Sequence, residues 1–416
     1  MSIVSIKPMT HAVHERVRLP GSKSISNRAL MMAALCQKPA TLSNVLRSDD
    51  TITCIEALDQ IISARKGGLF KKKIMGPVQV YCQDSGIVTR FLMPVCAALG
   101  GAYHFDGSTR MRERPIGALI EILQQQGVAF EFLEVPGKMP FILKAKGLPG
   151  GDVSVDIQDS SQFLSGLLIA APLSQQGMVL RSNQMIAKKP YVLMTLELMA
   201  KFGVQHEVLD DFSIQVLPQK YQPTKLAIEP DASTASYFFA AAALTKSSVI
   251  VEDLGMDSLQ GDMRFLEVLE RMGCKVTRSR TSSEVSGPQM FNALNEVDVT
   301  GFSDTFMTLS IMAPFLPTPT KIIGLRHTRL QESDRVAAMV DGLKRVGIRT
   351  EDTEDSLTIF PGTPVGAEID SHRDHRIAMS FGVMGLVVPG MSIAGAECVS
   401  KTCPEFFDLL VGFSRT

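Results

Sequence analysis

The sequence predicts an α/β protein built from six repeated units, three in each of two domains. In six places a short polar or acidic turn leads into a helix of small and aliphatic residues, and the copies recur roughly every 70 residues. A second helix follows each first one after about 25 residues, and short β-branched runs lie between the helices. Each unit is therefore close to β-α-β-α-β-β, and the even spacing identifies a repeat architecture.

The first helix of each unit is apolar nearly all round, as in FLSGLLIAAPL and TASYFFAAAAL. Such a helix belongs in a core, with its polar turn at the N-terminus. The polar turns contain Ser22, Asp84, Asp159, Asp231, Asp304 and Asp374. Asp and Ser are common N-caps because their side chains accept hydrogen bonds from free helix amides, so capping alone is one interpretation of these residues.

The second helices are amphipathic, as in IGALIEILQQQG, and should cover the first ones from outside. Their expected starts are Asp50, Arg114-Pro115, Lys189-Pro190, Gly261-Asp262, Ser333-Asp334 and Cys403-Pro404. Proline inside a helix start loses no needed hydrogen bond. Four of these helices end on a glycine suited to a left-handed C-cap, namely Gly127, Gly203, Gly273 and Gly347.

A chain of 416 residues is too long for one ordinary core, so two domains are expected. We predict one domain over residues 21–228, with the first three units. The second comprises residues 1–20 and 229–416, because the strand that precedes the first unit can pair with the C-terminal half. The active site is expected in the cleft between the domains.

Composition excludes several classes of function. The net charge of -1 gives no general attraction to nucleic acid or anionic membranes, and LFKKKIM at 69–75 is the one basic run. No apolar run reaches a membrane-spanning length, and no signal peptide opens the chain. The seven cysteines lack metal or disulfide spacing, which favours reduced thiols in the cytoplasm.

The helix starts point to anionic ligands. Free amides and the helix dipole favour an anion by about 0.3–2 kcal/mol at each N-terminus. Cationic residues at or beside the turns strengthen this, namely Lys23, Arg28, Arg110, Arg114, Arg335, Arg376 and Lys401. A nearly neutral chain with so many cations beside helix starts is predicted to bind a multiply anionic ligand.

Eight segments carry a family resemblance. They are LPGSKSISNRAL, STRMRERPIG, DSSQFLSGLLIAAPL, KKPYVLMTLELM, PDASTASYFFAAAAL, QESDRVAAM, DSHRDHRIAM and KTCPEFF. In order and spacing, over residues 19–410, the chain resembles the 5-enolpyruvylshikimate-3-phosphate synthases. The resemblance implies an inside-out α/β barrel with three βαβαββ units in each domain. It also implies transfer of the enolpyruvyl group of phosphoenolpyruvate to the 5-hydroxyl of shikimate 3-phosphate, with release of phosphate and no cofactor. An enzyme of this kind is expected to be a cytoplasmic monomer.

The resemblance also assigns roles to residues. Glu332 and Asp304 correspond to the carboxyl pair that serves proton transfer, and Lys23 lies between both substrates. The positions implied to bind phosphoenolpyruvate are Lys23, Gly86, Arg114, Gln162, Arg335, Arg376 and Lys401. Those implied to bind shikimate 3-phosphate are Lys23, Ser24, Arg28, Ser160, Ser161, Gln162, Lys188, Tyr191, Asp304, His327 and Gln331. His372 and His375 lack the spacing of a metal site, and we predict none.

Several positions depart from the family pattern. Ile87 and Phe91 replace a hydroxyl residue and a proline beside the phosphoenolpyruvate pocket. Lys188, His327 and Gln331 stand where serine, asparagine and lysine are usual, which leaves a different hydroxylated acceptor open. A paralogue that binds an anion without turnover is a second alternative. A related transferase acting on a UDP-amino sugar is a third, although no cysteine here lies in that family's loop motif.

Overall fold

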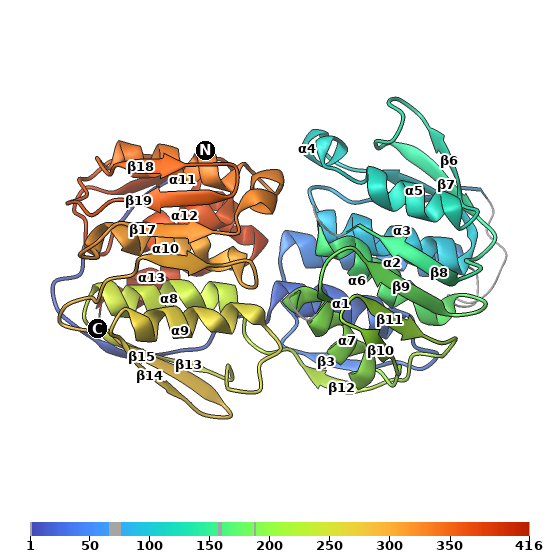
Figure 1. The fold of residues 1–416 in the computed structure, drawn as a ribbon, viewed down its shortest axis with the longest axis horizontal. Coiled ribbons are helices and arrows are strands. Elements are labelled where there is room, and N and C mark those ends of the chain that lie inside the picture. The colour runs from blue at the N-terminus through green and yellow to red at the C-terminus, as the bar shows by residue number, and fades with distance from the viewer. Residues whose placement is uncertain (1, 66–75, 157–159, 187–188, 416) are drawn as a thin grey trace. The chain divides into compact units, whose positions relative to one another are not determined.

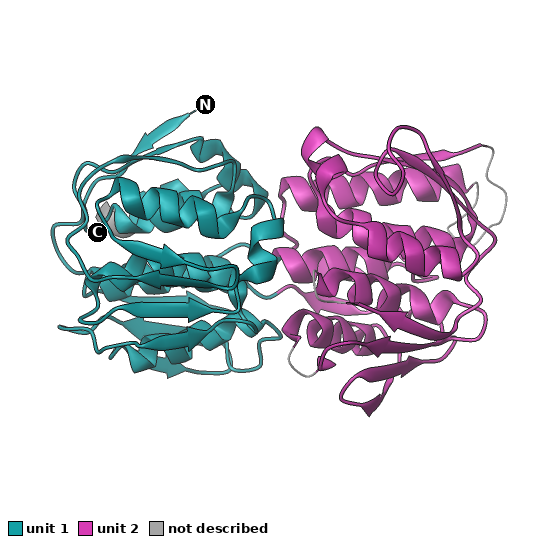
Figure 2. Cartoon of the chain, turned by 45° about the horizontal axis from the view of Figure 1, so that its top comes forward, with its two compact units in different colours: residues 1–22, 229–416 teal, residues 23–228 magenta. Residues whose placement is uncertain are grey.

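A computed structural model describes residues 2–65, 76–156, 160–186 and 189–415. The described chain is a mixed α/β fold with six sheets, which confirms the α/β part of the prediction. It divides into two compact units (Figure 2), unit 1 comprising Met1–Ser22 with Glu229–Thr416, and unit 2 comprising Lys23–Ile228. The expected basic run at 69–75 and the turn residue Asp159 lie outside the described residues.

Unit 2 holds three sheets that follow the repeat (Figure 1). Their strand orders are β12-β3, β4-β5-β7-β6 and β10-β11-β9-β8. The strands are β3 (Thr41–Ser43), β4 (Val78–Tyr81), β5 (Gly101–Asp106), β6 (Ala129–Phe132), β7 (Phe141–Ala145), β8 (Gly151–Val155), β9 (Met178–Ser182), β10 (Glu207–Asp210), β11 (Ser213–Val216) and β12 (Lys225–Ala227). In each four-stranded sheet one parallel pair, such as β4 with β5, joins an antiparallel hairpin. The parallel pair arises because the first helix carries the chain back across the sheet.

Unit 1 holds the other three sheets, with strand orders β14-β15-β13-β2, β16-β17-β19-β18 and β1-β21-β20. The strands are β1 (Ile3–Ser5), β2 (His14–Val17), β13 (Ser248–Glu252), β14 (Lys275–Arg278), β15 (Ser282–Ser286), β16 (Glu296–Asp298), β17 (Thr320–Ile323), β18 (Thr350–Asp352), β19 (Ser356–Ile359), β20 (Glu368–Asp370) and β21 (Ser392–Ala394). Ile3 pairs with Ala394 and His14 with Ser248, so both N-terminal strands complete sheets made from the C-terminal half.

The first helix of each unit lies in a core, as its composition predicts. These helices are α1 (Lys23–Ala34), α3 (Gly86–Leu99) and α6 (Ser161–Ala170) in unit 2, and α8 (Ala232–Leu244), α10 (Phe306–Met312) and α12 (His375–Met384) in unit 1. In unit 1, α8, α10 and α12 pack against one another (Figure 1). Small residues allow this close approach, since the whole run from Ala240 to Ala243 is buried.

The second helices are α2 (Asp49–Ala64), α5 (Gly117–Gln125), α7 (Pro190–Lys201), α9 (Phe265–Arg271), α11 (Arg335–Arg345) and α13 (Phe406–Arg415). Gly127, Gly203, Gly273 and Gly347 follow four of them with φ of 81°, 76°, 96° and 80°, which confirms the predicted left-handed caps. Three starts were predicted too early, those of α5, α9 and α13. A short helix α4 (Thr109–Glu113) precedes α5, and the 3₁₀ helix η3 (Gly261–Arg264) precedes α9.

The remaining described 3₁₀ helices are η1 (Ala171–Leu173), η4 (Ser303–Thr305), η5 (Ala313–Phe315), η6 (Arg326–Leu330) and η7 (Ala396–Lys401). Two of them carry charged residues of the predicted site. Asp304 lies in η4, and Lys401 is the last residue of η7. In the described chain no helix combines the length and apolarity needed to cross a bilayer.

We predict that Gly166→Ala destabilises unit 2. Pro94 lies inside α3 and has no amide hydrogen to bond the carbonyl of Arg90, and a Cβ on Gly166 of α6 would lie 2.4 Å from that oxygen. The added methyl group would push the two helices apart, at a cost of about 1–3 kcal/mol. Urea unfolding followed by circular dichroism measures this.

Gly117→Ala is the matched control, because a Cβ there meets nothing within 4 Å. This change should be neutral or stabilise α5 by up to about 1 kcal/mol. Equal unfolding midpoints for Gly166→Ala and the unmutated chain would contradict the proposed close packing of α3 on α6.

Candidate functional site

Arg335 is the centre of a charge cluster in unit 1. It begins α11, and its side chain is 2% exposed. Its guanidinium donates to Asp304 at 3.0 Å, to Glu332 at 2.8 Å and to Asp374 at 2.8 Å. A planar guanidinium has five donors on three nitrogen atoms in fixed directions, so Arg335 reaches three carboxylates around its plane, whereas the donors of a lysine all lie on one nitrogen.

Two more cations bind the same carboxylates. Arg376 of α12 donates to Asp304 at 2.8 Å, and Lys401 of η7 lies 3.6 Å from Glu332. Asp374 is the N-cap of α12 and accepts from the amide of Arg376. The predicted residues Asp304, Glu332, Arg335, Arg376 and Lys401 are therefore brought together within unit 1.

Gln331 and His327, which depart from the family pattern, also lie at this cluster. The side-chain oxygen of Gln331 accepts a hydrogen bond from Arg335. His327 in η6 lies with its Nε2 2.8 Å from the hydroxyl of Ser303, next to Asp304. Both positions therefore contact the neighbourhood of the carboxyl pair.

Burial and neighbouring charges both shift the pKa values of groups in this cluster. Burial opposes the charged form of Arg335, but Asp374, Glu332 and Asp304 outweigh it and hold its pKa above the ordinary value. Arg335 therefore stays cationic. A fourth carboxyl group, Asp262 of η3, is 5% exposed, and burial together with the charge of Asp304 raises its pKa to about 7.

Unit 2 carries a second set of predicted residues, at the starts of α1 and α7. Lys23 opens α1 with its ammonium 3.4 Å from Asp50 of α2. Arg28 is 1% exposed and donates to Thr195 at 2.7 Å and to the carbonyl oxygens of Ser24 and Tyr191. Burial lowers the pKa of Arg28 to about 10. These hydrogen bonds fix Arg28 between α1 and α7.

A third group of predicted residues lies where α3 and α6 begin. Arg90 donates to Gln162 at 2.8 Å, and Arg114 donates to the carbonyl of Asp84 at 3.3 Å. The Nε of Arg114 is buried, with no hydrogen-bond partner among the described atoms. A Cβ on Gly86 would lie 2.8 Å from the guanidinium of Arg114 and 2.9 Å from that of Arg90. Glycine at this position leaves room for both arginines beside the N-terminus of α3, an arrangement that favours an anion.

The remaining predicted residues of unit 2 have capping or backbone contacts. Ser160 caps α6 by accepting from the amide of Gln162, and Ser161 is the first residue of that helix. The carbonyl of Tyr191 accepts from Thr195 at 2.8 Å. Lys188 lies outside the described residues.

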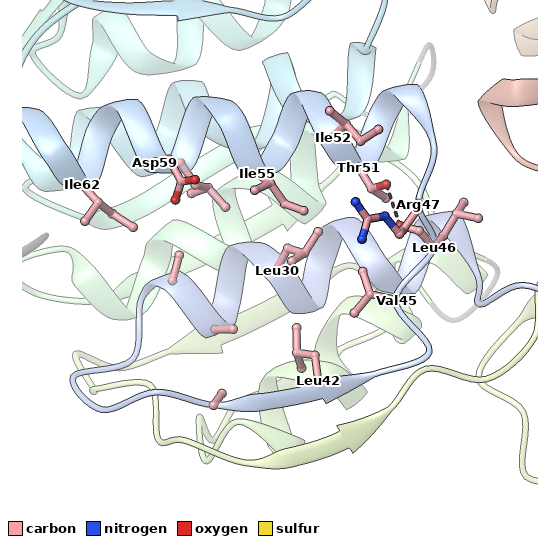
Figure 3. A pocket seen from close by; sticks show the side chains of 14 residues that line it. Leu30, Leu42, Val45, Leu46, Arg47, Thr51, Ile52, Ile55, Asp59 and Ile62 are labelled. Atoms are coloured by element: carbon pink, nitrogen blue, oxygen red, sulfur yellow. Dashed lines mark hydrogen bonds between the residues drawn. The ribbon is translucent and has the colours of Figure 1, made fainter.

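An apolar groove of about 610 Å³ lies apart from these charged groups (Figure 3). Leu30 of α1, Leu42 of β3, and Ile52 and Ile55 of α2 line it, with Arg47 and Asp59 among its polar residues. It contains none of the predicted site residues. A groove with this lining does not suit a multiply anionic ligand.

Sequence analysis did not select Asp262, Asp374 or Asp50 as site residues. Asp262 and Asp50 stood at expected helix starts, and Asp374 in a polar turn, where capping is a sufficient explanation. Their contacts with Ser233, Arg335 and Lys23 join residues that are distant in sequence. The one local signal that could have identified them as site residues is an Asp at a helix start close to a predicted catalytic motif.

Comparisons with known proteins agree on the fold and the family. The solved structure of the EPSP synthase from Acinetobacter baumannii superposes with a TM-score of 0.82 over 99% of this chain and 98% of that one, at 24% identity. The 3-phosphoshikimate 1-carboxyvinyltransferase of Nostoc punctiforme is 38% identical, with 98% of each chain covered. That of Aeromonas salmonicida is 37% identical, with 100% of each chain covered.

The fold is that of an α/β protein with repeated units, and its relatives are transferases. The family model for EPSP synthase (3-phosphoshikimate 1-carboxyvinyltransferase) matches residues 8–410. The chain belongs to this family, whose members serve the shikimate pathway to the aromatic amino acids.

Replacing Arg335 by Met should strongly destabilise unit 1. Three carboxylates would lose their shared buried partner, which costs about 3–5 kcal/mol. Arg335→Lys should recover little of this, because one ammonium cannot bind all three. Urea unfolding followed by circular dichroism measures both variants.

Arg345→Met provides the comparison from the same helix. Its ion pair with Asp341 is 2.8 Å long but half exposed, so its loss should cost no more than about 1 kcal/mol. Similar losses for Arg335→Met and Arg345→Met would show that the buried cluster does not stabilise the unit.

Proposed function

We propose that this protein transfers the enolpyruvyl group of phosphoenolpyruvate to the 5-hydroxyl of shikimate 3-phosphate and releases phosphate. The reaction proceeds by addition and elimination through a tetrahedral intermediate. The observation that carries the proposal is the pair Asp304 and Glu332, both bonded to Arg335 and flanked by Arg376 and Lys401. Proton transfer beside an anionic substrate requires such carboxyl groups among fixed cations.

The two carboxyl groups suit two proton transfers. Carbon 3 of phosphoenolpyruvate must gain a proton while the acceptor hydroxyl loses one and attacks carbon 2. We assign Glu332 and Asp304 to these transfers, with Lys23 as a third group able to share the base role. Both carboxyl groups are 16% exposed, so substrate can reach them while the protein still limits the access of water.

The cations suit the anionic groups of phosphoenolpyruvate. The residues proposed to bind it are Lys23, Gly86, Arg114, Gln162, Arg335, Arg376 and Lys401. An incoming carboxylate or phosphate replaces Asp304 and Glu332 as partner of the cations in unit 1. Binding therefore releases the carboxyl groups that the proton transfers require.

The proposed binding residues for shikimate 3-phosphate are Lys23, Ser24, Arg28, Ser160, Ser161, Gln162, Lys188, Tyr191, Asp304, His327 and Gln331. Ser160, at the start of α6, can present its hydroxyl to a phosphate beside free helix amides. Arg28 sits deeper, held by Thr195 and two carbonyl oxygens, so its role requires it to exchange one of these partners.

The two units are proposed to act on the same substrate pair, as the three-unit halves of an inside-out α/β barrel. The proposal rests on where the proposed phosphoenolpyruvate-binding residues lie. Arg114 and Gln162 belong to unit 2, and Arg335 and Arg376 belong to unit 1. We further propose a monomer that works in the cytoplasm. All seven cysteines are free thiols, which suits a reducing compartment.

Phosphate release from phosphoenolpyruvate by the purified protein, with and without shikimate 3-phosphate, tests the reaction. Release should depend on shikimate 3-phosphate and should fall about 10²- to 10⁴-fold in kcat for Glu332→Gln, because the amide cannot transfer the proton. Glu405→Gln, on the exposed surface before α13, is the control and should keep full activity.

Release that is independent of shikimate 3-phosphate, or absent altogether, would refute the assigned acceptor. Release supported by another hydroxylated acceptor would identify Gln331 and His327 as marks of changed specificity. Binding of both substrates by calorimetry without any release would establish a binding-only paralogue.

Gly86→Ala should lower kcat/KM for phosphoenolpyruvate by about tenfold to a hundredfold. The new methyl group displaces the guanidinium of Arg114 or Arg90 from the start of α3, and small misplacements of binding groups are costly. Steady-state kinetics measures this. Gly412→Ala, where a Cβ meets nothing within 4 Å, should have no effect, and an equal loss in both variants would exclude the proposed displacement.

A further inference from the structure

Arg28 is a buried arginine of unit 2, and none of its hydrogen-bond partners in the described chain is a carboxylate. It is 1% exposed, and burial lowers its pKa to about 10, so it is still cationic at neutral pH. Its partners are all neutral, namely the hydroxyls of Thr195 and Ser165 and the carbonyl oxygens of Ser24 and Tyr191. A buried charge without an opposite charge is costly, so an anion that binds beside it is strongly favoured.

Thr195 of α7 fixes one edge of this guanidinium. The Nε of Arg28 donates to the Thr195 hydroxyl at 2.7 Å, and Thr195 is fully buried. That hydroxyl has one hydrogen, which it can donate to the carbonyl of Tyr191 at 2.8 Å or to the hydroxyl of Ser165 at 3.1 Å. In either case its lone pairs are left to accept from Arg28. Thr195 therefore supplies the acceptor that the buried Nε–H requires.

Phe91 of α3 covers the guanidinium of Arg28 with its ring. The ring centroid lies 5.0 Å from the Cζ of Arg28, and the side chain of Phe91 is fully buried. The face of an aromatic ring attracts a cation, more strongly where water is excluded. The proline that is usual at this position has no aromatic ring to offer. Phe91 thus stabilises the charge of Arg28 without neutralising it.

The nitrogen of Arg28 that can turn to a ligand is Nη1. Its acceptor in the described chain is the carbonyl oxygen of Ser24, at 3.0 Å. Ser24 lies in the first turn of α1, where the same oxygen accepts from the main-chain amide of Arg28 as part of the helix. This oxygen keeps a hydrogen bond if Nη1 turns away from it. An oxyanion can therefore replace Ser24 as the partner of Nη1 at little cost.

We propose that Thr195 and Phe91 are positioning residues of the acceptor site, which hold the guanidinium of Arg28 so that its Nη1 binds an oxyanion group of shikimate 3-phosphate. The inference rests on the proposed function for the identity of this ligand. Both residues act through Arg28 rather than by contact with the ligand. A guanidinium that is already fixed loses little freedom when the anion binds, and this raises the affinity.

Binding of shikimate 3-phosphate to the purified full chain, measured by calorimetry, tests the role of Thr195. Thr195→Val keeps the shape of the side chain but cannot accept from Nε, so the Kd should rise about tenfold. Thr195→Ser keeps the hydroxyl and should recover most of the affinity. In steady-state kinetics, Thr195→Val should raise the KM for shikimate 3-phosphate with little change in kcat or in the KM for phosphoenolpyruvate. A general loss of structure would change all three.

Thr53→Val is the matched control for this change. Thr53 of α2 is 1% exposed, and its hydroxyl has no hydrogen-bond partner among the described atoms. Its removal should leave the Kd for shikimate 3-phosphate unchanged. An unchanged Kd in Thr195→Val as well would overturn the positioning role of Thr195.

Phe91→Leu tests the contribution of the ring. The change keeps a buried apolar side chain but removes the aromatic face, so the Kd should rise about fivefold to thirtyfold. Phe105→Leu is the control, because Phe105 of β5 is also fully buried but stacks on Phe141, with 5.5 Å between ring centroids. It should lose stability without a change in Kd. Equal Kd values for the two variants would exclude Phe91 from the proposal.

Arg28→Lys shows whether both residues act through the arginine. Lysine has no Nε–H to bond Thr195, so the Kd should rise at least as much as in Thr195→Val. Adding Thr195→Val to Arg28→Lys should then cause little further loss, because the two changes remove the same interaction. Losses that simply add would overturn the proposal.

A measurement without ligand separates this inference from the proposed reaction. Hydrogen exchange of the Arg28 Nε–H can be followed by NMR on protein with isotope-labelled arginine, the signal being assigned by its absence in Arg28→Lys. Exchange should be about tenfold or more faster in Thr195→Val than in the unmutated protein, because the bond that protects this hydrogen is lost. Equal rates would overturn the positioning role. No binding of shikimate 3-phosphate by the unmutated protein would instead refute the proposed acceptor.

Discussion

Arg335 must be held cationic within a protein interior, and unit 1 is arranged around this requirement. Its guanidinium is matched by carboxylates at several of its donors, and these come from η4, from the turn before α11 and from the start of α12. The buried helices must therefore bring their N-terminal turns together. The small residues that let α8, α10 and α12 pack closely serve the same end, because they allow short side chains such as Asp304 and Asp374 to meet one arginine.

The cations of the two units have different hydrogen-bond partners. In unit 1 the cations are already paired with carboxylates, so the proposed anion would have to displace Asp304 or Glu332 and would add negative charge to the cluster. At the start of α3 in unit 2, Arg90 and Arg114 bond neutral oxygens of Gln162, Pro115 and Asp84, and glycine at position 86 leaves room for them. Under the proposed function, the cations of unit 1 would exchange a carboxylate for the anion, whereas those at the start of α3 would exchange a neutral oxygen.

Local patterns were sufficient for the α/β repeat and its glycine caps, because capping, periodicity and left-handed glycines act within a few residues. The contacts of the candidate site could not be read in this way. Arg28 bonds Thr195 across 167 positions, and Asp262 bonds Ser233 across 29. Asp262 looked like an ordinary helix start, and only its burial beside Asp304 separates it from a cap. The roles of Glu332 and Lys23 came from the family resemblance, since nothing in their local sequence distinguishes them from surface charges.

The pairing of both N-terminal strands with the C-terminal half has a consequence for synthesis on the ribosome. Unit 2 is one continuous stretch, so it can fold as soon as its last strand, β12, has emerged. Unit 1 begins first but cannot finish until β21 and α12 have been made, since β1 pairs with β21 and Arg335 needs Asp374. Its first 22 residues must wait with open strand edges while some 200 residues of unit 2 are added. The polar and charged residues around β2, His14, Glu15 and Arg16, suit an edge that has to remain soluble during that delay.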